Sequence, residues 1–355
     1  MSYNSGWKAL NMEFTDKVPR TEYSAHNHWE LVKEVTGIDT SKEENRKNAS
    51  SEFLRKWDYA FMWSTSGAGQ YLKMRGGRTT DMGHAEYAEL ANGRSDFRDT
   101  VQAPFKDPED VWALDVWKEY GEFDKKTLVK DFEDTYKRIS TTYPNTLNMT
   151  GIYTTMVSGL LNILGWDMFL LSLGTDEKKF AKLMDMYCEW IKQFYDACAE
   201  TSIPVFMCHD DMVWTSGPFA SPDWYRKNLF PKYKKLLAPL KEAGKKIIFT
   251  SDGTYTMFFD DIVDCGADML VMEPSSDMTL FAEKYGKTHG FVGNADCRIL
   301  LDGSKEDIYK EVERCMNTGK KYPGFIMAVG NHIPQNTPVD NALYYNEAYE
   351  KLSAR

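Results

Sequence analysis

Ile203-Pro-Val-Phe-Met-Cys-His-Asp-Asp211 is the first of five apolar runs that lead into polar or charged residues. The other four are Lys246-Ile-Ile-Phe-Thr-Ser-Asp-Gly253, Asp268-Met-Leu-Val-Met-Glu-Pro274, His289-Gly-Phe-Val-Gly-Asn-Ala-Asp296 and Phe325-Ile-Met-Ala-Val-Gly-Asn-His332. Short apolar runs of this kind are typical of strands that are buried on both faces. Helix-like stretches long enough for crossovers between parallel strands separate them. The carboxyl ends of such strands meet at one rim, where we expect the chemistry.

Three earlier segments complete a set of eight predicted strands: Val18 to Tyr23, Tyr59 to Ser64 and Thr146 to Met149. No internal repeat or Pro/Ser-rich linker divides the sequence. We therefore predict an α/β fold in which residues 1–355 form a single (β/α)8 TIM barrel with N-terminal helical elaborations. The apolar face between Asp176 and Ser202 predicts a long amphipathic helix. For residues 93–98 we predict a loop.

The composition, with 42% hydrophobic residues, 27% charged residues and a net charge of −10, is that of an ordinary soluble protein. Basic clusters interleaved with aromatic residues are missing, which argues against nucleic acid as a partner. No apolar run approaches the roughly 20 residues that cross a bilayer, and Met1 to Lys8 lack the regions of a signal peptide. We expect a cytoplasmic protein without a membrane partner. The six cysteines contain no CxxC pair, so neither a zinc ribbon nor a disulfide framework is indicated.

Candidate catalytic residues follow two of the predicted strands. Three consecutive polar residues, more than a turn needs, follow the first run: His209, Asp210 and Asp211. We predict that at least one of them serves as metal ligand, as proton donor or as a group that orients a ligand. The alternative for both aspartates is helix capping. Asp296 is placed either to support the site or to cap the next helix.

Candidate metal ligands and binding residues lie at the same predicted rim. Asp252, Glu273 and His332 offer the oxygen and nitrogen donors that zinc accepts. Adjacent strand residues point in opposite directions, so Asn331 competes with His332 for the place that faces the site. The aromatic residues Trp224, Tyr225 and Tyr255 are candidates for lining a substrate pocket, with core packing as the alternative. For His26 and His28, after the first strand, metal binding competes with a surface or capping role.

The segment His209-Asp-Asp-Met-Val-Trp-Thr-Ser-Gly-Pro-Phe-Ala-Ser-Pro-Asp-Trp-Tyr225, followed by Phe230-Pro-Lys-Tyr-Lys234, resembles the uroporphyrinogen decarboxylase superfamily. Further landmarks follow in the order of that superfamily: Phe249-Thr-Ser-Asp-Gly253, Glu273-Pro274, Gly293-Asn-Ala-Asp296 and Gly330-Asn-His-Ile-Pro-Gln-Asn-Thr-Pro-Val-Asp-Asn341. The resemblance covers roughly residues 200–345. It implies a barrel that either decarboxylates a porphyrinogen or, with zinc, transfers methyl groups to or from a corrinoid protein.

Departures from the superfamily's patterns favour one branch. The decarboxylases hold carboxylates with an early arginine-bearing motif, but Pro19 to His28 contains a single arginine, Arg20. The coenzyme M methyltransferases bind zinc through cysteines, where this chain has Asp252 and Asn331. An oxygen-rich zinc site resembles instead the O-demethylase methyltransferases, in which zinc acts as a Lewis acid on a phenyl methyl ether.

The resemblance thus implies a zinc-dependent methyltransferase that passes a methyl group from a small, methoxy-aromatic substrate to cobalt. The corrinoid is expected on a separate protein, because the chain has no Asp-x-His-x-x-Gly motif. Two alternatives stay open. One is a decarboxylase that uses Asp211 and an arginine such as Arg20, and the other is a catalytically silent barrel that binds a ligand or a corrinoid protein.

Overall fold

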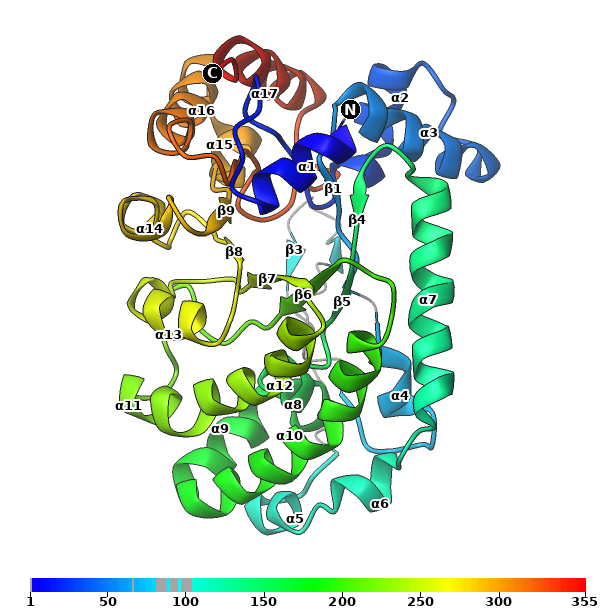
Figure 1. Cartoon of the computed structure of the whole chain (residues 1–355), viewed down its shortest axis with the longest axis vertical. Helices are drawn as coiled ribbons and strands as arrows, with labels where there is room; N and C mark the ends of the chain where they lie inside the picture. The colour runs from blue at the N-terminus through cyan, green and yellow to red at the C-terminus, as the bar shows by residue number, and fades with distance from the viewer. Residues whose placement is uncertain (1, 66, 81–87, 90–94, 97–103) are drawn as a thin grey trace.

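A computed structural model describes residues 2–65, 67–80, 88–89, 95–96 and 104–355. Its main sheet has six parallel strands in the order β10-β9-β8-β7-β6-β5 (Figure 1). Their bounds are β5 (Thr150–Ile152), β6 (Val205–His209), β7 (Lys246–Thr250), β8 (Met269–Val271), β9 (Gly290–Val292) and β10 (Phe325–Ile326). Two further parallel strands, β1 (Phe61–Met62) and β4 (Leu147–Asn148), pair with each other. The loop predicted at residues 93–98 lies largely outside the described residues.

The backbone at Arg20 closes these strands into a barrel. Arg20 forms parallel bridges with Tyr59 on one side and Met327 on the other. The Ala60 N–H donates to the Arg20 carbonyl at 2.7 Å, and the Thr21 N–H donates to the Met327 carbonyl at 3.0 Å. All eight predicted strand positions thus lie around one barrel, and the predicted TIM-barrel fold is confirmed. The first of them forms bridges rather than a longer ladder.

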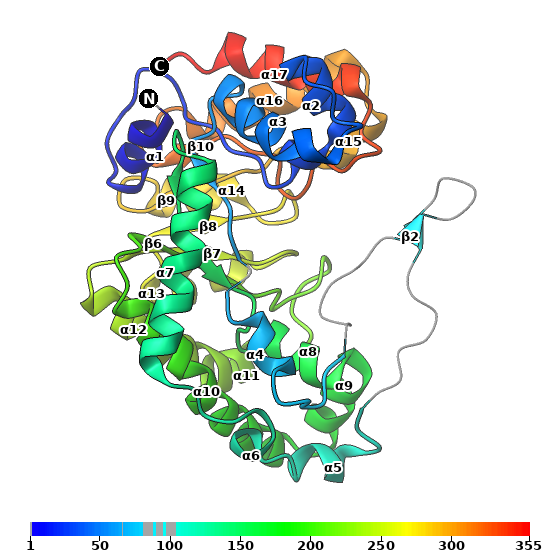
Figure 2. The same cartoon turned by 90° about the vertical axis from the view of Figure 1, so that its right-hand side faces the viewer.

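Helices surround the barrel and extend it at both ends (Figures 1 and 2). The N-terminal elaborations are α1 (Ser2–Leu10), α2 (Trp29–Thr36) and α3 (Glu43–Lys56). Figure 1 shows both termini at the same end of the molecule as α15 (Cys297–Asp302), α16 (Lys305–Gly319) and α17 (Val339–Leu352). At the opposite end lie α5 (Pro108–Trp112), α6 (Val116–Tyr120), α9 (Trp166–Thr175) and α10 (Glu177–Ala199).

The remaining elements connect these layers. They are α4 (Gly69–Lys73), α7 (Lys125–Thr142), α8 (Ser158–Leu164), α11 (Pro222–Trp224), α12 (Phe230–Glu242), α13 (Phe259–Asp264), α14 (Met278–Tyr285) and the antiparallel pair β2 (Ala88–Glu89) and β3 (Ser95–Asp96). Helix α10 confirms the predicted amphipathic helix. The Asp176 carboxylate accepts the N–H groups of Lys178 and Lys179 at its start, both at 3.0 Å. Within the described ranges, no helix combines the length and apolar character needed to cross a bilayer.

Side chains alternate along β6, and this alternation positions the site. Val205 and Met207 belong to the apolar cluster inside the barrel, which α1 closes at the amino-terminal end with Ala9 and Leu10. The intervening side chains of β6 pack against the surrounding helices instead. His209 has the same parity as Val205 and Met207, so its side chain continues the interior column at the carboxyl end of the strand.

Candidate functional site

Three side chains from two neighbouring strand ends converge at the carboxyl rim. His209 ends β6, Asp211 follows it, and Asp252 comes just after β7. One possible ligand atom of each lies within 4.8 Å of those of the other two. The structure therefore brings together two of the predicted catalytic residues and one predicted metal ligand.

The two ring nitrogens of His209 have different surroundings. Nδ1 lies 3.1 Å from the Tyr23 hydroxyl. Nε2 is buried, lies 3.3 Å from Oδ1 of Asp211 and makes no hydrogen bond. Burial alone would lower the pKa of His209, but the adjacent Asp211 carboxylate outweighs burial, and the pKa is raised. A buried nitrogen that faces carboxylates and makes no hydrogen bond is suited to a cation.

Asp211 is held as an ionised carboxylate. The Tyr153 hydroxyl donates to its Oδ2, and the Asp252 N–H donates to its Oδ1 at 3.0 Å. Burial acts to raise the pKa of Asp211, but the adjacent His209 ring, together with the hydrogen bonds from Tyr153 and Asp252, lowers it to about 2. These contacts join the ends of β5, β6 and β7.

Glu273 and Asn331 extend the cluster toward β8 and β10. The Asn331 amide donates to Oε1 of Glu273 at 2.6 Å and reaches Oδ2 of Asp252 at 3.4 Å. The Gly253 N–H donates to Oε2 of Glu273 at 2.7 Å. Burial, with the charges of Asp211 and Glu273, raises the pKa of Asp252 to about 7. Three carboxylates this close favour a proton or a metal ion among them.

Asn331, rather than His332, lies among the carboxylates. The exposed His332 directs Nδ1 toward the Ser24 hydroxyl at 2.9 Å, and its ring stands edge-on to Tyr23 with centroids 4.8 Å apart. Both residues lie beyond β10, which ends at Ile326, so the course of the backbone after the strand sets these two directions. Of the predicted metal set, Asp252 and Glu273 come together, and His332 is placed elsewhere.

Asp210 faces away from the cluster and holds the start of α8. Its buried carboxylate accepts the N–H groups of Val157 at 2.9 Å and Ser158 at 2.7 Å, and the Tyr233 hydroxyl also donates to it. Burial raises the pKa of Asp210. Asp210 thus caps a helix, as the alternative prediction stated. The helix is α8, which precedes Asp210 in the sequence, and not the helix that follows it.

Asp296 also lies at a helix start. It caps α15, accepting the Arg298 N–H at 2.9 Å, and its carboxylate pairs with the Arg298 guanidinium at 2.6 Å. Asp296 thus caps a helix, which was the alternative role, and its carboxylate interacts with Arg298 rather than with the cluster.

The aromatic candidates for substrate binding lie in the core. Trp224, Tyr225 and Tyr255 are all buried. The Tyr225 hydroxyl donates to the Met212 carbonyl at 2.7 Å, and the Tyr255 hydroxyl donates to the Val271 carbonyl. Both tyrosine hydroxyls thus have backbone partners within the packed layer.

The histidine pair after the first predicted strand is also separate from the cluster. Nδ1 of His28 accepts the Leu31 N–H at 3.2 Å, which caps α2, and Nε2 lies 2.8 Å from the Thr337 carbonyl. His26 is buried with its ring edge-on to Tyr143, and burial lowers its pKa to about 4. Both histidines therefore serve the N-terminal elaboration.

Tyr23 and Tyr153 are residues that the sequence reasoning missed. Tyr23 approaches His209 and Tyr153 donates to Asp211, as described above. Burial raises the pKa of Tyr23 to about 12, so its hydroxyl stays protonated at neutral pH. Each tyrosine ends or follows a predicted strand, and this position was the available signal.

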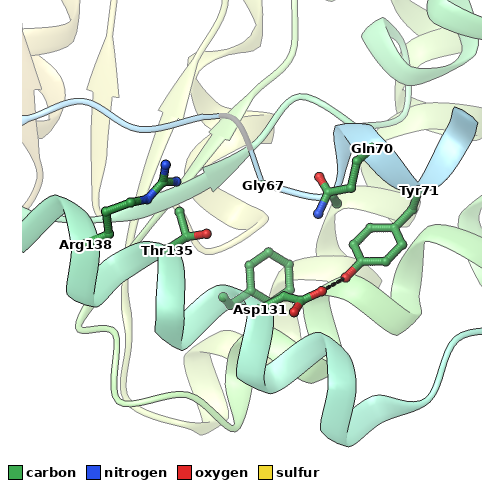
Figure 3. Close-up of a pocket in the computed structure, with 8 residues that line it drawn as sticks. Gly67, Gln70, Tyr71, Asp131, Thr135 and Arg138 are labelled. Carbon is green, nitrogen blue, oxygen red and sulfur yellow. Dashed lines mark hydrogen bonds between the residues drawn. The ribbon is translucent and has the colours of Figure 1, made fainter. Parts of the chain in front are cut away.

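A cavity of about 190 Å³ lies apart from the cluster, between α4 and α7 (Figure 3). Figure 3 shows Tyr71 and Asp131 side by side in its lining, where the tyrosine hydroxyl donates to the carboxylate. None of the predicted site residues lines it. We therefore base the function on the rim cluster.

The donor set at the rim fits zinc. An imidazole nitrogen and carboxylate oxygens are usual zinc ligands, and Nε2 of His209, which makes no hydrogen bond, lies beside Asp211 and Asp252. Glu273 adds a carboxylate next to Asp252 through Asn331. The residues present could thus hold this metal without cysteine.

A family model for uroporphyrinogen decarboxylase (URO-D) matches residues 98–352. The uroporphyrinogen decarboxylase of Carboxydothermus hydrogenoformans is 29% identical over 134 residues, 38% of each chain. That of Thermus thermophilus is 26% identical over 179 residues, 50% of each chain. The matched part thus spans half or less of the length of these curated relatives.

A solved structure, a methyltransferase from Methanosarcina mazei, has a TM-score of 0.64 at 16% identity. The alignment covers 99% of this chain and 98% of that one, so the two share a fold. The family match extends over more than half of the sequence, and the chain therefore belongs to the uroporphyrinogen decarboxylase family.

Proposed function

We propose that the chain is a zinc-dependent methyltransferase that passes a methyl group from a small methoxy-aromatic substrate to the cobalt of a corrinoid on a separate protein. The observation that carries this proposal is the convergence of His209, Asp211 and Asp252, in which a buried imidazole nitrogen faces carboxylates and makes no hydrogen bond. It lies at the carboxyl rim, where TIM barrels carry their chemistry.

Five side chains of the rim have assigned parts in this proposal. His209, Asp211 and Asp252 would hold zinc, with Glu273 as the adjacent ligand candidate. The bound metal would supply Lewis acidity toward the ether oxygen, which makes the phenolate a better leaving group. Asn331 orients Glu273 by its hydrogen bond, so the carboxylates keep their positions without a basic side chain.

The proposed reaction balances without a further oxidant or reductant. Cobalt(I) of the acceptor attacks the methyl carbon, and the carbon–oxygen bond breaks with its electron pair on oxygen. Cobalt supplies both electrons of the new cobalt–carbon bond and is formally oxidised to cobalt(III). The phenolate then takes a proton from solvent and leaves as the phenol.

The charge of the rim argues against a substrate with several carboxylates. Asp211, Asp252 and Glu273 gather there, and no Lys or Arg in the described ranges forms an ion pair with them. Arg20, the arginine of the decarboxylase alternative, is fully buried and pairs with Glu22 at 3.2 Å. A polycarboxylate would therefore meet like charge rather than a cationic cleft.

The proposal is tested by methyl transfer to free cobalamin, reduced to cobalt(I), from a methoxy-aromatic compound with zinc present. We expect zinc-dependent loss of the cobalt(I) absorbance, which Asp252→Asn abolishes. A parallel assay measures carbon dioxide release from a porphyrinogen. Carbon dioxide without methyl transfer would replace this proposal by the decarboxylase, and neither activity in a folded, zinc-loaded chain would favour the silent barrel.

A further inference from the structure

The two ring nitrogens of His209 face groups of different chemistry. Nδ1 lies 3.1 Å from the Tyr23 hydroxyl, which can donate or accept a hydrogen bond. Nε2 lies 3.3 Å from a carboxylate oxygen of Asp211, which can only accept. A neutral imidazole carries one proton, so its location decides whether Nε2 can act as a ligand.

Two neutral tautomers fit these neighbours. When Nε2 carries the proton, it points toward the Asp211 carboxylate and Nδ1 accepts the proton of the Tyr23 hydroxyl. When Nδ1 carries the proton, it donates to the Tyr23 oxygen, and the Tyr23 hydroxyl can turn to Oγ1 of Thr65, 3.4 Å away. In the second case the Nε2 lone pair faces carboxylates, which is unfavourable unless a cation lies between them.

The Tyr23 ring is also held in place. It stacks on Trp63 with centroids 6.0 Å apart and meets the ring of His332 edge-on. Tyr23 is the residue after Glu22, whose buried carboxylate accepts the Val329 N–H at 2.9 Å and so fixes the backbone beside Tyr23. The hydroxyl therefore has a fixed location, and from there it can either donate a hydrogen bond to Nδ1 or accept one from it.

We infer that Tyr23, supported by Thr65, is a positioning residue that holds His209 as the Nδ1–H tautomer when a divalent cation lies among Nε2, Asp211 and Asp252. The inference rests on the proposed function for the identity of that cation as zinc. A hydroxyl suits the task because it accepts from Nδ1–H in the metal-bound form and donates to Nδ1 in the other tautomer. Partners of this kind raise the affinity of a histidine ligand for its metal.

Zinc affinity of single variants is the first test. Equilibrium competition with a chelating dye compares the wild-type chain with Tyr23→Phe, and we expect about 10- to 100-fold weaker binding in the variant. Thr65→Val should weaken binding in the same direction by a smaller factor. The matched control is Tyr349→Phe, which removes a buried hydroxyl that donates to the Val18 carbonyl at 2.7 Å, and it should bind as the wild type does.

The tautomer itself is the second readout. Nitrogen NMR of chain labelled at its histidines shows which ring nitrogen carries the proton, and loss of a signal in His209→Gln identifies His209. We expect zinc to give a protonated Nδ1 in the wild type and a mixture of tautomers in Tyr23→Phe. Wild-type affinity and tautomer in Tyr23→Phe would overturn this inference alone. A wild-type chain that binds no zinc would overturn the proposed metal site and this inference with it.

Discussion

Asn331 donates a hydrogen bond from Nδ2 to Oε1 of Glu273 at 2.6 Å and so joins the ends of two strands that are not neighbours in the sheet. The same amide reaches Oδ2 of Asp252 at 3.4 Å. A neutral donor between two carboxylates reduces their repulsion without occupying the cation position. This arrangement keeps an acidic rim intact in the metal-free chain.

Asn331→Asp should destabilise the metal-free protein by about 1–3 kcal/mol, because it removes the donor and adds a third negative charge beside two others. Zinc should then stabilise this variant more than it stabilises the wild type. The control Asn331→Leu removes the donor without adding charge, and zinc should stabilise it no more than it stabilises the wild type. Urea unfolding with and without zinc measures both, and equal zinc responses in the two variants would contradict the account.

Asp211→Asn and Asp252→Asn should each weaken zinc binding by at least about tenfold, because each removes a charged ligand candidate. Two matched controls test residues that the sequence also suggested. Asp296→Asn should bind zinc normally and lose less than about 1 kcal/mol of stability, because asparagine caps a helix nearly as well as aspartate. His332→Gln should also keep its zinc, and a loss of zinc in either control would show that the ligand set is wrong.

His26 should make stability depend on pH. Burial lowers its folded pKa to about 4, whereas the unfolded side chain takes up a proton near pH 6.5. The unfolded state therefore binds more protons between these values, and the free energy of unfolding falls as the pH drops from about 6.5 toward 4. The effect is on the order of 3 kcal/mol at most.

The matched measurement for His26 is urea unfolding as a function of pH in the wild type and in His26→Phe. In the variant, the free energy of unfolding should depend less on pH over this range, because the carboxylates of the chain still contribute to this dependence but His26 does not. Parallel curves for the two proteins over this range would show that His26 does not cause the effect.

The buried pair of Arg20 and Glu22 should contribute to stability rather than to substrate binding. Both side chains are fully buried, and the Tyr345 hydroxyl also donates to Glu22 at 2.7 Å. Arg20→Met leaves the Glu22 carboxylate without its cation and should cost about 3–5 kcal/mol in urea unfolding. The double variant with Glu22→Gln should be less destabilised than Arg20→Met. A stable Arg20→Met that had lost only substrate affinity would instead support the decarboxylase.

The barrel could be predicted because its strands are short apolar runs with polar carboxyl ends. The same pattern put Asp252 and Glu273 at the rim, since both follow buried strands directly. For His209 the parity of β6 also points inward, in line with Val205 and Met207. These features depend on local sequence and on the period of a strand, which a sequence displays.

Other parts of the site depend on contacts between distant segments. Asp210 and Asp211 are neighbours, yet one holds α8 and the other faces His209, and this division follows from where Val157 and Ser158 lie. The choice between Asn331 and His332 follows from the backbone beyond β10. For Tyr23 and Tyr153, the position at or after a predicted strand was a signal, but residue type did not separate them from buried tyrosines, because a tyrosine serves equally well in the core or at a rim.

Zinc content and chelation test the central claim most directly. The purified chain is analysed for metal, treated with a chelator, and assayed for methyl transfer from a methoxy-aromatic compound to cobalt(I) cobalamin before and after zinc is restored. The account predicts about one zinc for each chain, loss of transfer on chelation and recovery with zinc. A chain without stoichiometric zinc whose methyl transfer survives chelation would contradict it.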